Sequence, residues 1–555
     1  MTGRLPKELR RLLSLLPGPA DLRTARRSPG RDLVAGLTVA VVALPLALAF
    51  GVASGLGAEA GLTTAVIAGI IAAVFGGSNL QISGPTGAMT VVLLPVVHDF
   101  GTQGVLLVGV MAGVVLVALA VSGIGKAVRL LPTSLVEGFT AGIAVVIVLQ
   151  QVPAMLGLDP GEGEQVWAIA GDAVARWTSD IDVAPLLMTL GVAAVILTGT
   201  RLLPTVPASI LVIIVATVLA EFLGLGLPTI GEIPAGIPAP TSSFIDLAAV
   251  PALFPSALAV AALAALESLL CATVADSMSV SERHDPDREL LGQGLANIVV
   301  PFFGGVPATA AIARTAVNVR AGARSRVAAI THSLVLLVVI YAASDLVGHI
   351  PLAALAGVLL ATCLQMVGVG SLSALVRSTR ADAIVLFLTF AITVAVDLVT
   401  AVVVGVIVAA LLALGSVSRS ARLEQVPLDE DRGDHSVEEL ALLADRIVAY
   451  RFEGPLFFGA AHRFLLELTE VSDVDVVILR MSRISTLDAT GATIVDDAVR
   501  RLEARGIAVL ISGVHPVHSR VLRTLNVAPH LRQAGRVFEN TPQAITYARG
   551  LVASH

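Results

Sequence analysis

Long hydrophobic runs separated by short polar connections extend from about residue 32 to residue 417, and the pattern ends abruptly there. A helix that crosses a bilayer needs about 20 mostly apolar residues, and fewer when it is broken inside the membrane. By this criterion the sequence predicts fourteen membrane spans. They are Leu33–Leu56, Thr63–Phe75, Gly87–Val97, Val105–Gly123, Glu137–Val152, Val183–Leu197, Ile210–Leu223, Leu253–Ala275, Leu291–Phe303, Ala308–Val319, Ala328–Ala343, Leu352–Val367, Ala383–Val396 and Thr400–Leu414.

Composition supports a membrane protein. Hydrophobic residues make up 55% of the 555-residue chain and charged residues only 14%, against roughly 25% in soluble domains. The mean hydropathy is +0.88. These values argue against a soluble enzyme, and the net charge of −6 gives no indication of nucleic-acid binding. Residues 1–31 are basic and lack a long apolar core, so we expect a cytosolic extension rather than a signal peptide.

The basic residues of the connections predict the orientation of the spans, because Lys and Arg gather in cytosolic loops. With a cytosolic N-terminus, the outer connections carry one basic residue, Arg176. The inner connections carry Lys126, Arg129, Arg201, Arg283, Arg288, Arg320, Arg324, Arg326, Arg377 and Arg380. The sequence therefore predicts an even number of spans and cytoplasmic termini.

The two halves of the hydrophobic region repeat each other. Phe75-Gly76-Gly77 precedes the break at Gly84-Pro85-Thr86, and Phe303-Gly304-Gly305 precedes the break at Val306-Pro307-Ala308. Because seven spans per copy is an odd number, the second copy must be inverted. Inverted repeats with interrupted helices at matching positions are typical of secondary transporters.

The sequence after residue 417 resembles that of a soluble domain. We expect a linker over residues 418–445 and one small α/β domain over residues 446–555. Its predicted strands and helices are Ile447–Phe452, Ala461–Glu470, Val474–Leu479, Ala492–Ala504, Ile507–Ser512, Val517–Leu525 and Gln543–Leu551.

The two breaks form the first candidate binding site. A short helix that starts after such a break has free N–H groups and the positive end of its dipole at the first turn. Two inverted half-helices would point these ends at each other across the membrane midplane and bind an anion. Gly87 lies in the first turn of one half-helix and Ala308 in that of the other, with the Thr86 and Thr309 hydroxyls as further donors. The alternative is that both breaks are ordinary kinks.

Two ionisable residues lie inside predicted spans. Glu267 is surrounded by apolar residues, and a carboxylate there costs roughly 2.5–3.5 kcal/mol on insertion scales, so we expect it to face a cavity and hold a coupling ion. It could instead be a protonated acid bonded to a neighbouring helix. Arg314 lies about two turns after Pro307 and would add positive charge to the anion site, or else pair with a carboxylate or snorkel.

Cofactor chemistry is not indicated by the sequence. Cys271 and Cys363 lie in apolar runs and are interpreted as small buried residues rather than a disulfide or metal pair. Gly125-Lys126 lacks the other residues of a phosphate-binding loop, so no nucleotide-driven pump is predicted. The driving force would be an ion gradient or that of the substrate.

Four motifs, in order, resemble those of the sulfate permease (SulP) family of anion transporters. They are Leu44–Phe50, Gln81–Thr86, Glu267–Ala272 and Pro307–Thr315. The C-terminal region resembles a STAS domain, the fold of anti-sigma-factor antagonists. The resemblance covers about residues 30 to 550.

The resemblance implies a 7+7 inverted repeat divided into core and gate domains, usually assembled as a homodimer in the inner membrane, with a cytosolic STAS domain that has its own partner. It implies a small inorganic or dicarboxylate anion between spans three and ten, at Thr86, Gly87, Ala308, Thr309 and Arg314. Glu267 matches the acidic coupling position. The coupling ion would be H⁺ or Na⁺, and Na⁺ would lie near Glu267, Cys271 and Thr309.

Two departures from the family pattern affect function. Leu46 stands where sulfate-type members commonly have glutamine, so sulfate, bicarbonate and C4-dicarboxylates remain equal candidates. Ala489 stands at the position of the phosphorylated serine of soluble antagonists, which excludes phosphorylation there, and we expect the neighbouring Thr490 to cap the following helix. The main hypothesis is a cation-coupled symporter; the alternatives are an uncoupled channel or exchanger, and an anion sensor that signals through the STAS domain.

Overall fold

The chain divides into two units, residues 1–406 and 407–555, which are described separately. The structure is a computed structural model that describes residues 15–26, 28–123, 125, 132–159, 165–202, 208–279, 283–396, 398–420, 422–425, 446–456 and 474–553. The predicted helix Ala461–Glu470 and the inner-loop residues Lys126 and Arg129 lie outside these ranges.

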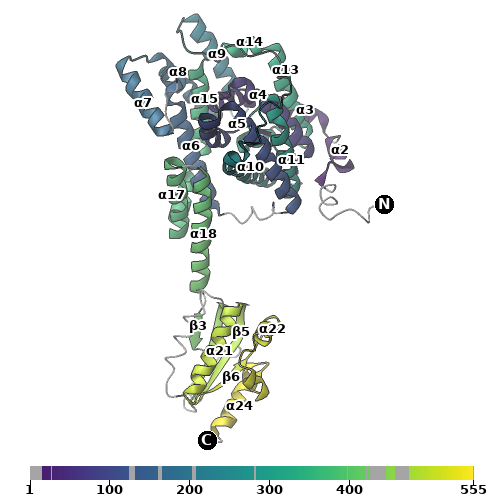
Figure 1. The fold of residues 1–555 in the computed structure, drawn as a ribbon, viewed down its shortest axis with the longest axis vertical. Coiled ribbons are helices and arrows are strands. Elements are labelled where there is room, and N and C mark those ends of the chain that lie inside the picture. Colours follow the sequence, from purple (N-terminus) through teal and green to yellow (C-terminus); the bar gives the residue numbers. More distant parts are fainter. Residues whose placement is uncertain are drawn as a thin grey trace. The chain divides into compact units, whose positions relative to one another are not determined.

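The first unit is helical, and its elements follow the two predicted halves (Figure 1). A short helix, α2 (Pro19–Ala25), precedes them. The first half contains α3 (Pro29–Ala53), α4 (Ala58–Phe75), β1 (Ser83–Gly84), α5 (Gly87–Ser122), α6 (Thr133–Met155), α7 (Val166–Ser179), α8 (Ala184–Leu202) and α9 (Ala208–Phe222). The second contains α10 (Val250–Met278), α11 (Pro286–Val299), η2 (Val300–Phe303), β2 (Thr309–Ala310), α12 (Ile312–Arg320), α13 (Val327–Ala342), α14 (Ser344–Gly348), α15 (Leu352–Met366), α16 (Val369–Ser378), α17 (Arg380–Ala395) and the start of α18 (Leu398–Ser420), which continues into the second unit.

Every predicted span overlaps a helix of the structure, although Ala308–Val319 begins with the strand residues of β2 rather than with a helix. Spans three and four are merged in α5, which is interrupted at Gly101, where φ is +63° and ψ is −167°, a backbone conformation that glycine adopts without strain. Within the described residues, seven helical segments are long and apolar enough to cross a membrane, and three shorter apolar helices accompany them. The structure adds α7, α14 and α16, which the apolar pattern did not predict.

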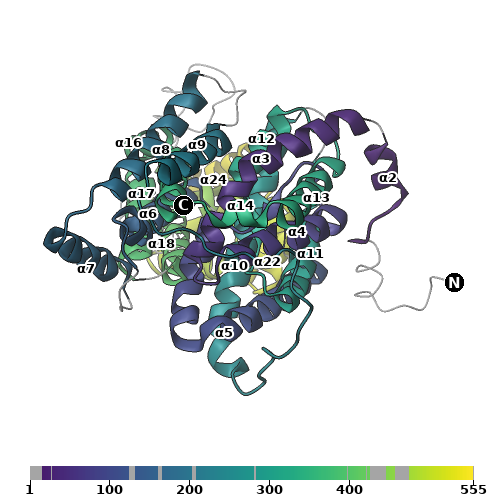
Figure 2. The ribbon, with the colours of Figure 1, turned by 90° about the horizontal axis from the view of Figure 1, so that it is seen from above.

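The helices of the first unit pack in two groups. The core helices are α3, α4, α5, α10, α11, α12 and α13, in which α3 and α4 both contact α13, and α5 contacts α10 and α11. The gate helices are α6, α8, α9, α15 and α17, in which α6 contacts α15 and α17. The two groups meet where α3 packs on α9 and α15 and where α5 packs on α6. In the view of Figure 2 the gate helices and the core helices lie on opposite sides of this junction.

The breaks in the two halves meet in a two-residue antiparallel ladder. Ser83 pairs with Ala310 and Gly84 with Thr309. Since α5 and α12 both begin just after these strands, they leave the ladder in opposite directions, each with its N-terminus at the ladder. This is the geometry of two interrupted helices facing each other.

The second unit is an α/β domain built on a five-stranded sheet of order β3-β4-β5-β6-β7. The strands are β3 (Arg422–Gln425), β4 (Ile447–Leu456), β5 (Val476–Leu487), β6 (Ala508–Ser512) and β7 (Val537–Phe538); β3 pairs antiparallel with β4 and the other neighbours are parallel. The helices are α21 (Ala489–Ala504), α22 (Pro516–Thr524), α23 (Pro529–Gln533) and α24 (Thr541–Ala553). Buried residues of α21 and α22 pack on one face of the sheet, and those of α24 on the other.

Two details of this unit differ from the sequence-based predictions. The predicted linker begins with structured residues, because α18 continues to Ser420 and residues 422–425 form the edge strand β3. Thr490 does not cap the following helix: α21 begins at Ala489, and its N-cap is Asp488, whose carboxylate accepts from the Gly491 amide at 2.7 Å.

Candidate anion site at the crossing of the two repeats

Thr86 is the residue at which the first broken helix begins. It is the N-cap of α5, with extended backbone, and it is 4% exposed. Its hydroxyl does not cap α5; it donates to Glu267 Oε2 of α10 at 3.1 Å. The first-turn amides of α5 therefore have no side-chain cap, and they remain available to an anion.

Gly87, the first residue of α5, lies at the junction of the core and gate helices. A Cβ built on it would lie 3.1 Å from Phe50 Cε1 of α3 and would also meet the side chain of Ile147 of α6. The sequence predicted Gly87 as part of the site, and the structure places it where a gate helix approaches the end of the half-helix. A larger residue at this position would displace Ile147 or Phe50.

Arg314 brings a positive charge to the same helix end from the second repeat. It lies in the first turn of α12, is 1% exposed, and donates from Nη2 to the Pro85 carbonyl across the ladder. Gly84 makes room for it, since a Cβ there would lie 2.6 Å from Arg314 Nη1. Nε and Nη1 of Arg314 have no hydrogen-bond partner within the described part of the chain. Buried guanidinium donors without acceptors suit an anionic ligand.

Glu267 and Arg314 lie close enough to interact electrostatically, and Thr86 links the carboxylate to the N-terminus of α5. The sequence predicted these three residues separately, and the structure brings them together. A carboxylate, a guanidinium and an uncapped helix end at one place can bind an anion together with a proton or a small cation.

The second half-helix starts later than predicted, which changes the roles of Ala308 and Thr309. The expected helix Ala308–Val319 was wrong at its start: α12 begins at Ile312, with Ala311 as N-cap. Thr309 lies instead in β2, because its backbone pairs with the first repeat. Pro85 and Pro307, which the sequence placed at equivalent positions of the two breaks, are not equivalent in the structure. Pro85 follows β1, whereas Pro307 precedes β2.

Both residues have intramolecular partners. The Thr309 hydroxyl lies 2.9 Å from Ser268 Oγ and is fully buried. The backbone of Ala308 donates to Asn297 Oδ1 and accepts from Asn297 Nδ2, each at 2.8 Å. The Ala308 amide is therefore not a free donor at a helix end, contrary to the sequence-based prediction. The predicted contact of Thr309 with substrate stays a prediction.

α11 carries a buried polar face that was not predicted from the sequence. Glu289, Gln293 and Asn297 are spaced four residues apart and share one side of this helix. Gln293 Nε2 donates to Ser83 Oγ of β1 at 2.7 Å and to Glu289 Oε1 at 3.0 Å. Since Asn297 bonds the backbone of Ala308 just before β2, α11 contacts both crossing strands or their immediate ends. The regular four-residue spacing of polar side chains in an apolar segment was the available signal.

The predicted cation site comprises Glu267, Cys271 and Thr309. Cys271 donates to Thr315 Oγ1 at 3.2 Å, and Thr309 contacts Ser268, so two of the three predicted ligands have other partners. Within the described residues no group of three His, Cys, Asp or Glu side chains could hold a metal ion. A bound Na⁺ at Glu267 would rely on hydroxyl and backbone oxygens, which are the ligands that hard cations prefer.

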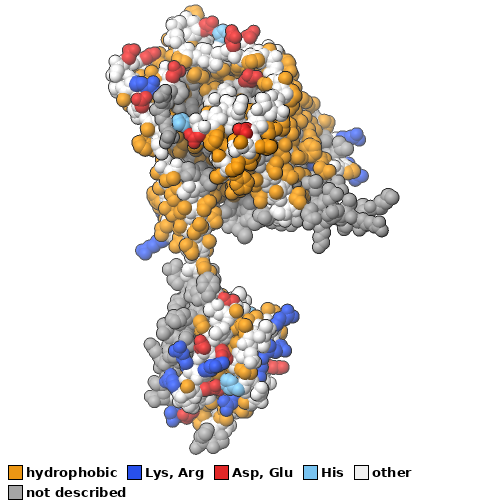
Figure 3. Space-filling view, in the orientation of Figure 1, with side chains coloured by type: hydrophobic (Ala, Val, Ile, Leu, Met, Phe, Trp, Pro, Cys, Tyr) orange, Lys and Arg blue, Asp and Glu red, His pale blue; other side chains and the backbone are white. Residues whose placement is uncertain are grey.

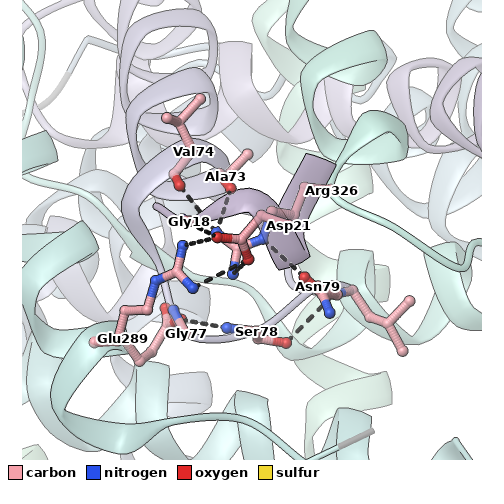
Figure 4. A network of polar contacts seen from close by, with 11 residues as sticks. Gly18, Asp21, Ala73, Val74, Gly77, Ser78, Asn79, Glu289 and Arg326 are labelled. Atoms are coloured by element: carbon pink, nitrogen blue, oxygen red, sulfur yellow. Dashed lines mark hydrogen bonds and ion pairs between the residues drawn. The ribbon is translucent and has the colours of Figure 1, made fainter. Parts of the chain in front are cut away.

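A second polar cluster lies at the ends of the core helices (Figure 4). Asp21 of α2 accepts from Arg288 at 3.1 and 2.8 Å, from Arg326 at 3.2 Å and from the Gly18 amide at 2.8 Å. Arg326 also donates to Asn79 Oδ1 at 2.7 Å and to the carbonyls that end α4. We call this set the Asp21 clasp; it fastens α2 to α4, α11 and α13.

The fold and the crossing half-helices define a membrane transporter of the inverted-repeat class. Comparison with protein families agrees: the Sulfate permease family matches residues 30–389, and the STAS domain matches residues 441–544. The chain therefore belongs to the sulfate permease family of anion transporters and carries a C-terminal STAS domain.

Relatives over most of the chain support this assignment. A protein of Bacillus subtilis named putative sulfate transporter YvdB is 35% identical over 87% of this chain and 91% of its own length. The bicarbonate transporter BicA of Picosynechococcus is 31% identical over 89% of this chain and 90% of its own length.

Two solved structures share the fold. The transmembrane domain of a cyanobacterial BicA is 33% identical, with a TM-score of 0.62 over 68% of this chain and 98% of its own. Murine Solute Carrier 26 family member A9, an anion transporter in the inward-facing state, gives a TM-score of 0.84 at 17% identity over 99% of this chain and 96% of its own. At that identity the second likeness concerns the fold alone.

Proposed function

We propose that this protein is a secondary active transporter of a small oxyanion, bound between the start of α5 and Arg314 and coupled to H⁺ or Na⁺ through Glu267. The observation that carries the proposal is the 3.1 Å contact from Thr86 to Glu267, because it joins the candidate coupling acid to the N-cap of the half-helix. A proton or Na⁺ bound at Glu267 would alter the hydrogen bond that Thr86 donates to this carboxylate, and so would directly affect the anion site at the start of α5.

Charge balance explains why the site would need both an acid that binds a cation and positively charged groups that bind the anion. Moving one negative charge against a membrane potential costs about 2.3 kcal/mol per 100 mV, and a co-transported cation offsets that charge. Glu267 is the place for the cation, while Arg314 and the α5 dipole hold the anion. Alternating access would follow from movement of the core helices against the gate helices at the junction near Gly87 and Ile147.

Bicarbonate and sulfate are the leading substrates, because the named functions of the relatives at 31% and 35% identity are bicarbonate and putative sulfate transport. C4-dicarboxylates are the third candidate. We further propose a homodimer in the inner membrane, with residues 1–31 and the STAS domain in the cytosol and a cytosolic partner for the STAS domain. No nucleic acid and no organic cofactor enter this scheme.

Uptake in proteoliposomes tests the proposal. Labelled bicarbonate, sulfate and fumarate are offered with an imposed Na⁺ gradient, an imposed pH gradient or neither. The proposal expects one anion to accumulate above its equilibrium level only with one of the cation gradients. Downhill flux that ignores both gradients would instead indicate the channel or exchanger, and binding with no flux would indicate the sensor.

Arg314 variants separate anion binding from coupling in the same vesicles. Arg314→Ala should weaken substrate binding, and Arg314→Lys should retain part of it, because a point charge replaces some of the guanidinium field. Unchanged affinity in both variants would assign Arg314 a structural role.

A further inference from the structure

The connection between α6 and α8 contains an amphipathic helix that the transport mechanism does not use. It is α7, fourteen residues long, and it lies at the outer edge of the first unit beside α6 in both ribbon views (Figures 1 and 2). It carries both tryptophans of the whole chain, Trp167 and Trp177. An otherwise tryptophan-free chain that places both on one surface helix suggests a specific environment for that helix.

The side chains of α7 divide into three sectors. Ala170 and Ala173 are buried and face the rest of the unit. Trp167 and Val174, seven residues apart and therefore on one side of the helix, are 57% and 46% exposed. Asp172 lies nearly opposite them and pairs with Arg176 at 2.8 Å. The exposed apolar sector thus adjoins the packed sector, and the ion pair is on the far side.

The exposed apolar sector is continuous with a surface that lies against lipid in a membrane protein. Ile181, which follows α7, and Leu187 at the start of α8 are 61% and 64% exposed. From there the apolar surface continues along α8 and α9, where Val195, Val215 and Leu219 line a groove. In Figure 3 charged side chains gather at the upper end of the unit, near the place where Figure 1 labels α7, and hydrophobic side chains cover the surface below them. The apolar sector of α7 therefore lies at the rim of the lipid-facing surface.

The second repeat has a helix of the same kind in the same place. α16 lies between α15 and α17, as α7 lies between α6 and α8, and both α6 and α15 have a proline as N-cap. Val369 and Val376 of α16 are 73% and 43% exposed and seven residues apart, and no residue of α16 is buried. Because an exposed apolar sector occurs at matched positions in α7 and α16, we infer that the two helices have the same kind of environment.

We propose that α7 is a membrane-surface helix whose partner is the interfacial layer of the lipid bilayer, with Trp167 and Val174 as the side chains that enter it. Tryptophan prefers this layer because its ring is apolar and its N–H is polar, and amphipathic helices of this size lie in the interface plane. Because Asp172 and Arg176 neutralise each other, the attraction is apolar rather than electrostatic. The helix would hold the gate helices at a fixed depth in the bilayer.

The two tryptophans make the test direct in the full-length protein. Trp177→Phe leaves Trp167 as the only indole, and Trp167→Phe leaves Trp177, which faces the same side as Ala170 and Ala173 and donates to the Asp182 carbonyl at 2.7 Å. Each variant is reconstituted in vesicles of phosphatidylcholine brominated near the head or near the middle of its acyl chains. Iodide in the buffer reports exposure to water.

Trp167 should be quenched several-fold more by lipid brominated near the head than near the middle, and only weakly by iodide. Trp177 serves as the matched control and should be quenched less by either lipid. Adding anionic lipid should leave the Trp167 quenching unchanged. Three results would each overturn the proposal: full iodide quenching without lipid quenching, strongest quenching by the mid-chain bromine, or protection of Trp167 from all quenchers, as a second copy of the chain would give.

Discussion

In the proposed function coupling depends on Glu267, and a neutral mimic of this residue separates coupling from binding. Glu267→Gln keeps a side chain of the same shape beside Thr86 but cannot take up a proton or attract Na⁺ as a carboxylate does. We expect the variant to fold and bind anion, to lose accumulation driven by the cation gradient, and to retain exchange of one anion for another. Uptake with a gradient and exchange without one are measured in the same vesicles.

The coupling role of Glu267 would be wrong if this variant accumulated anion against its gradient at the wild-type rate. Thr86→Val is the matched control at the other end of the contact, because it removes the hydroxyl that donates to Glu267 and leaves the carboxyl in place.

Gly84 is predicted to be essential because of the guanidinium that lies against it. Gly84→Ala would place a Cβ 2.6 Å from Arg314 Nη1 and force the guanidinium away from Pro85. A hydrogen bond to a charged group contributes about 1.5–3 kcal/mol, so we expect anion affinity to fall about tenfold or more. Titration of the purified protein with substrate anion measures this change. Gly191→Ala, where no atom lies within 4 Å of the added Cβ, should leave affinity unchanged.

At the scale of elements, the Asp21 clasp attaches a short helix to three others through one carboxylate. Burial by itself would raise the pKa of Asp21, but hydrogen bonds from Arg288 and Gly18 and the charge of Arg326 together hold it below its usual value. A lowered pKa means that the stabilisation is present above the pKa of the unfolded chain and is lost as pH falls through the folded-state pKa.

Asp21→Asn should therefore lower stability by about 1–2 kcal/mol at neutral pH, between the values typical of exposed and of buried ion pairs. The difference from wild type should shrink in acid as the wild-type carboxyl becomes protonated. Thermal unfolding in detergent across pH measures both effects. Asp172→Asn, which breaks an exposed pair within one helix, is the control and should change stability little. An equal loss in the two variants would contradict a special role for the clasp.

At the scale of the whole molecule, the sidedness of the chain is open to a simple chemical test. The two native cysteines are buried, at 0% and 2% exposure, so wild-type protein should react little with a membrane-impermeant maleimide. Ser179→Cys, at the last residue of α7 and on the same side as Asp172, should label in intact cells. Glu539→Cys, in the second unit, should label only after permeabilisation. The opposite pattern would reverse the predicted topology.

Removal of the second unit tests which part holds the anion site. Every residue assigned to the site lies between residues 84 and 314, within the first unit. Deletion of residues 446–555 should therefore preserve substrate binding in protein that elutes as a single species, while assembly or regulation changes. Complete loss of binding in such well-folded protein would show that the site needs the second unit.

The sequence was sufficient for features that depend on local pattern. The spans, the repeat and the strands β4, β5 and β6 of the second unit follow from apolar periodicity and from breaks at Gly84 and Pro85. The start of α12 could not be predicted from the sequence. Pro307 locally favours a helix that begins beside it, but Thr309 pairs instead with Gly84, 225 residues away in the chain. The amphipathic α7 was missed because its apolar residues are too few for a span and recur with a helical period rather than in a run.

The crossing of the repeats also has a consequence for biosynthesis. Buried polar groups of the first half find their partners far downstream: Thr64 bonds Val306, 242 residues away, and Asp32 bonds Ser325, 293 residues away. At a translation rate of 5–20 residues per second, Asp32 would wait roughly 15–60 s for its partner. During that interval the nascent first half exposes an unpaired carboxylate and an incomplete core. Its early helices would therefore stay in contact with the insertion machinery, and the core would close only when the second repeat emerges from the ribosome.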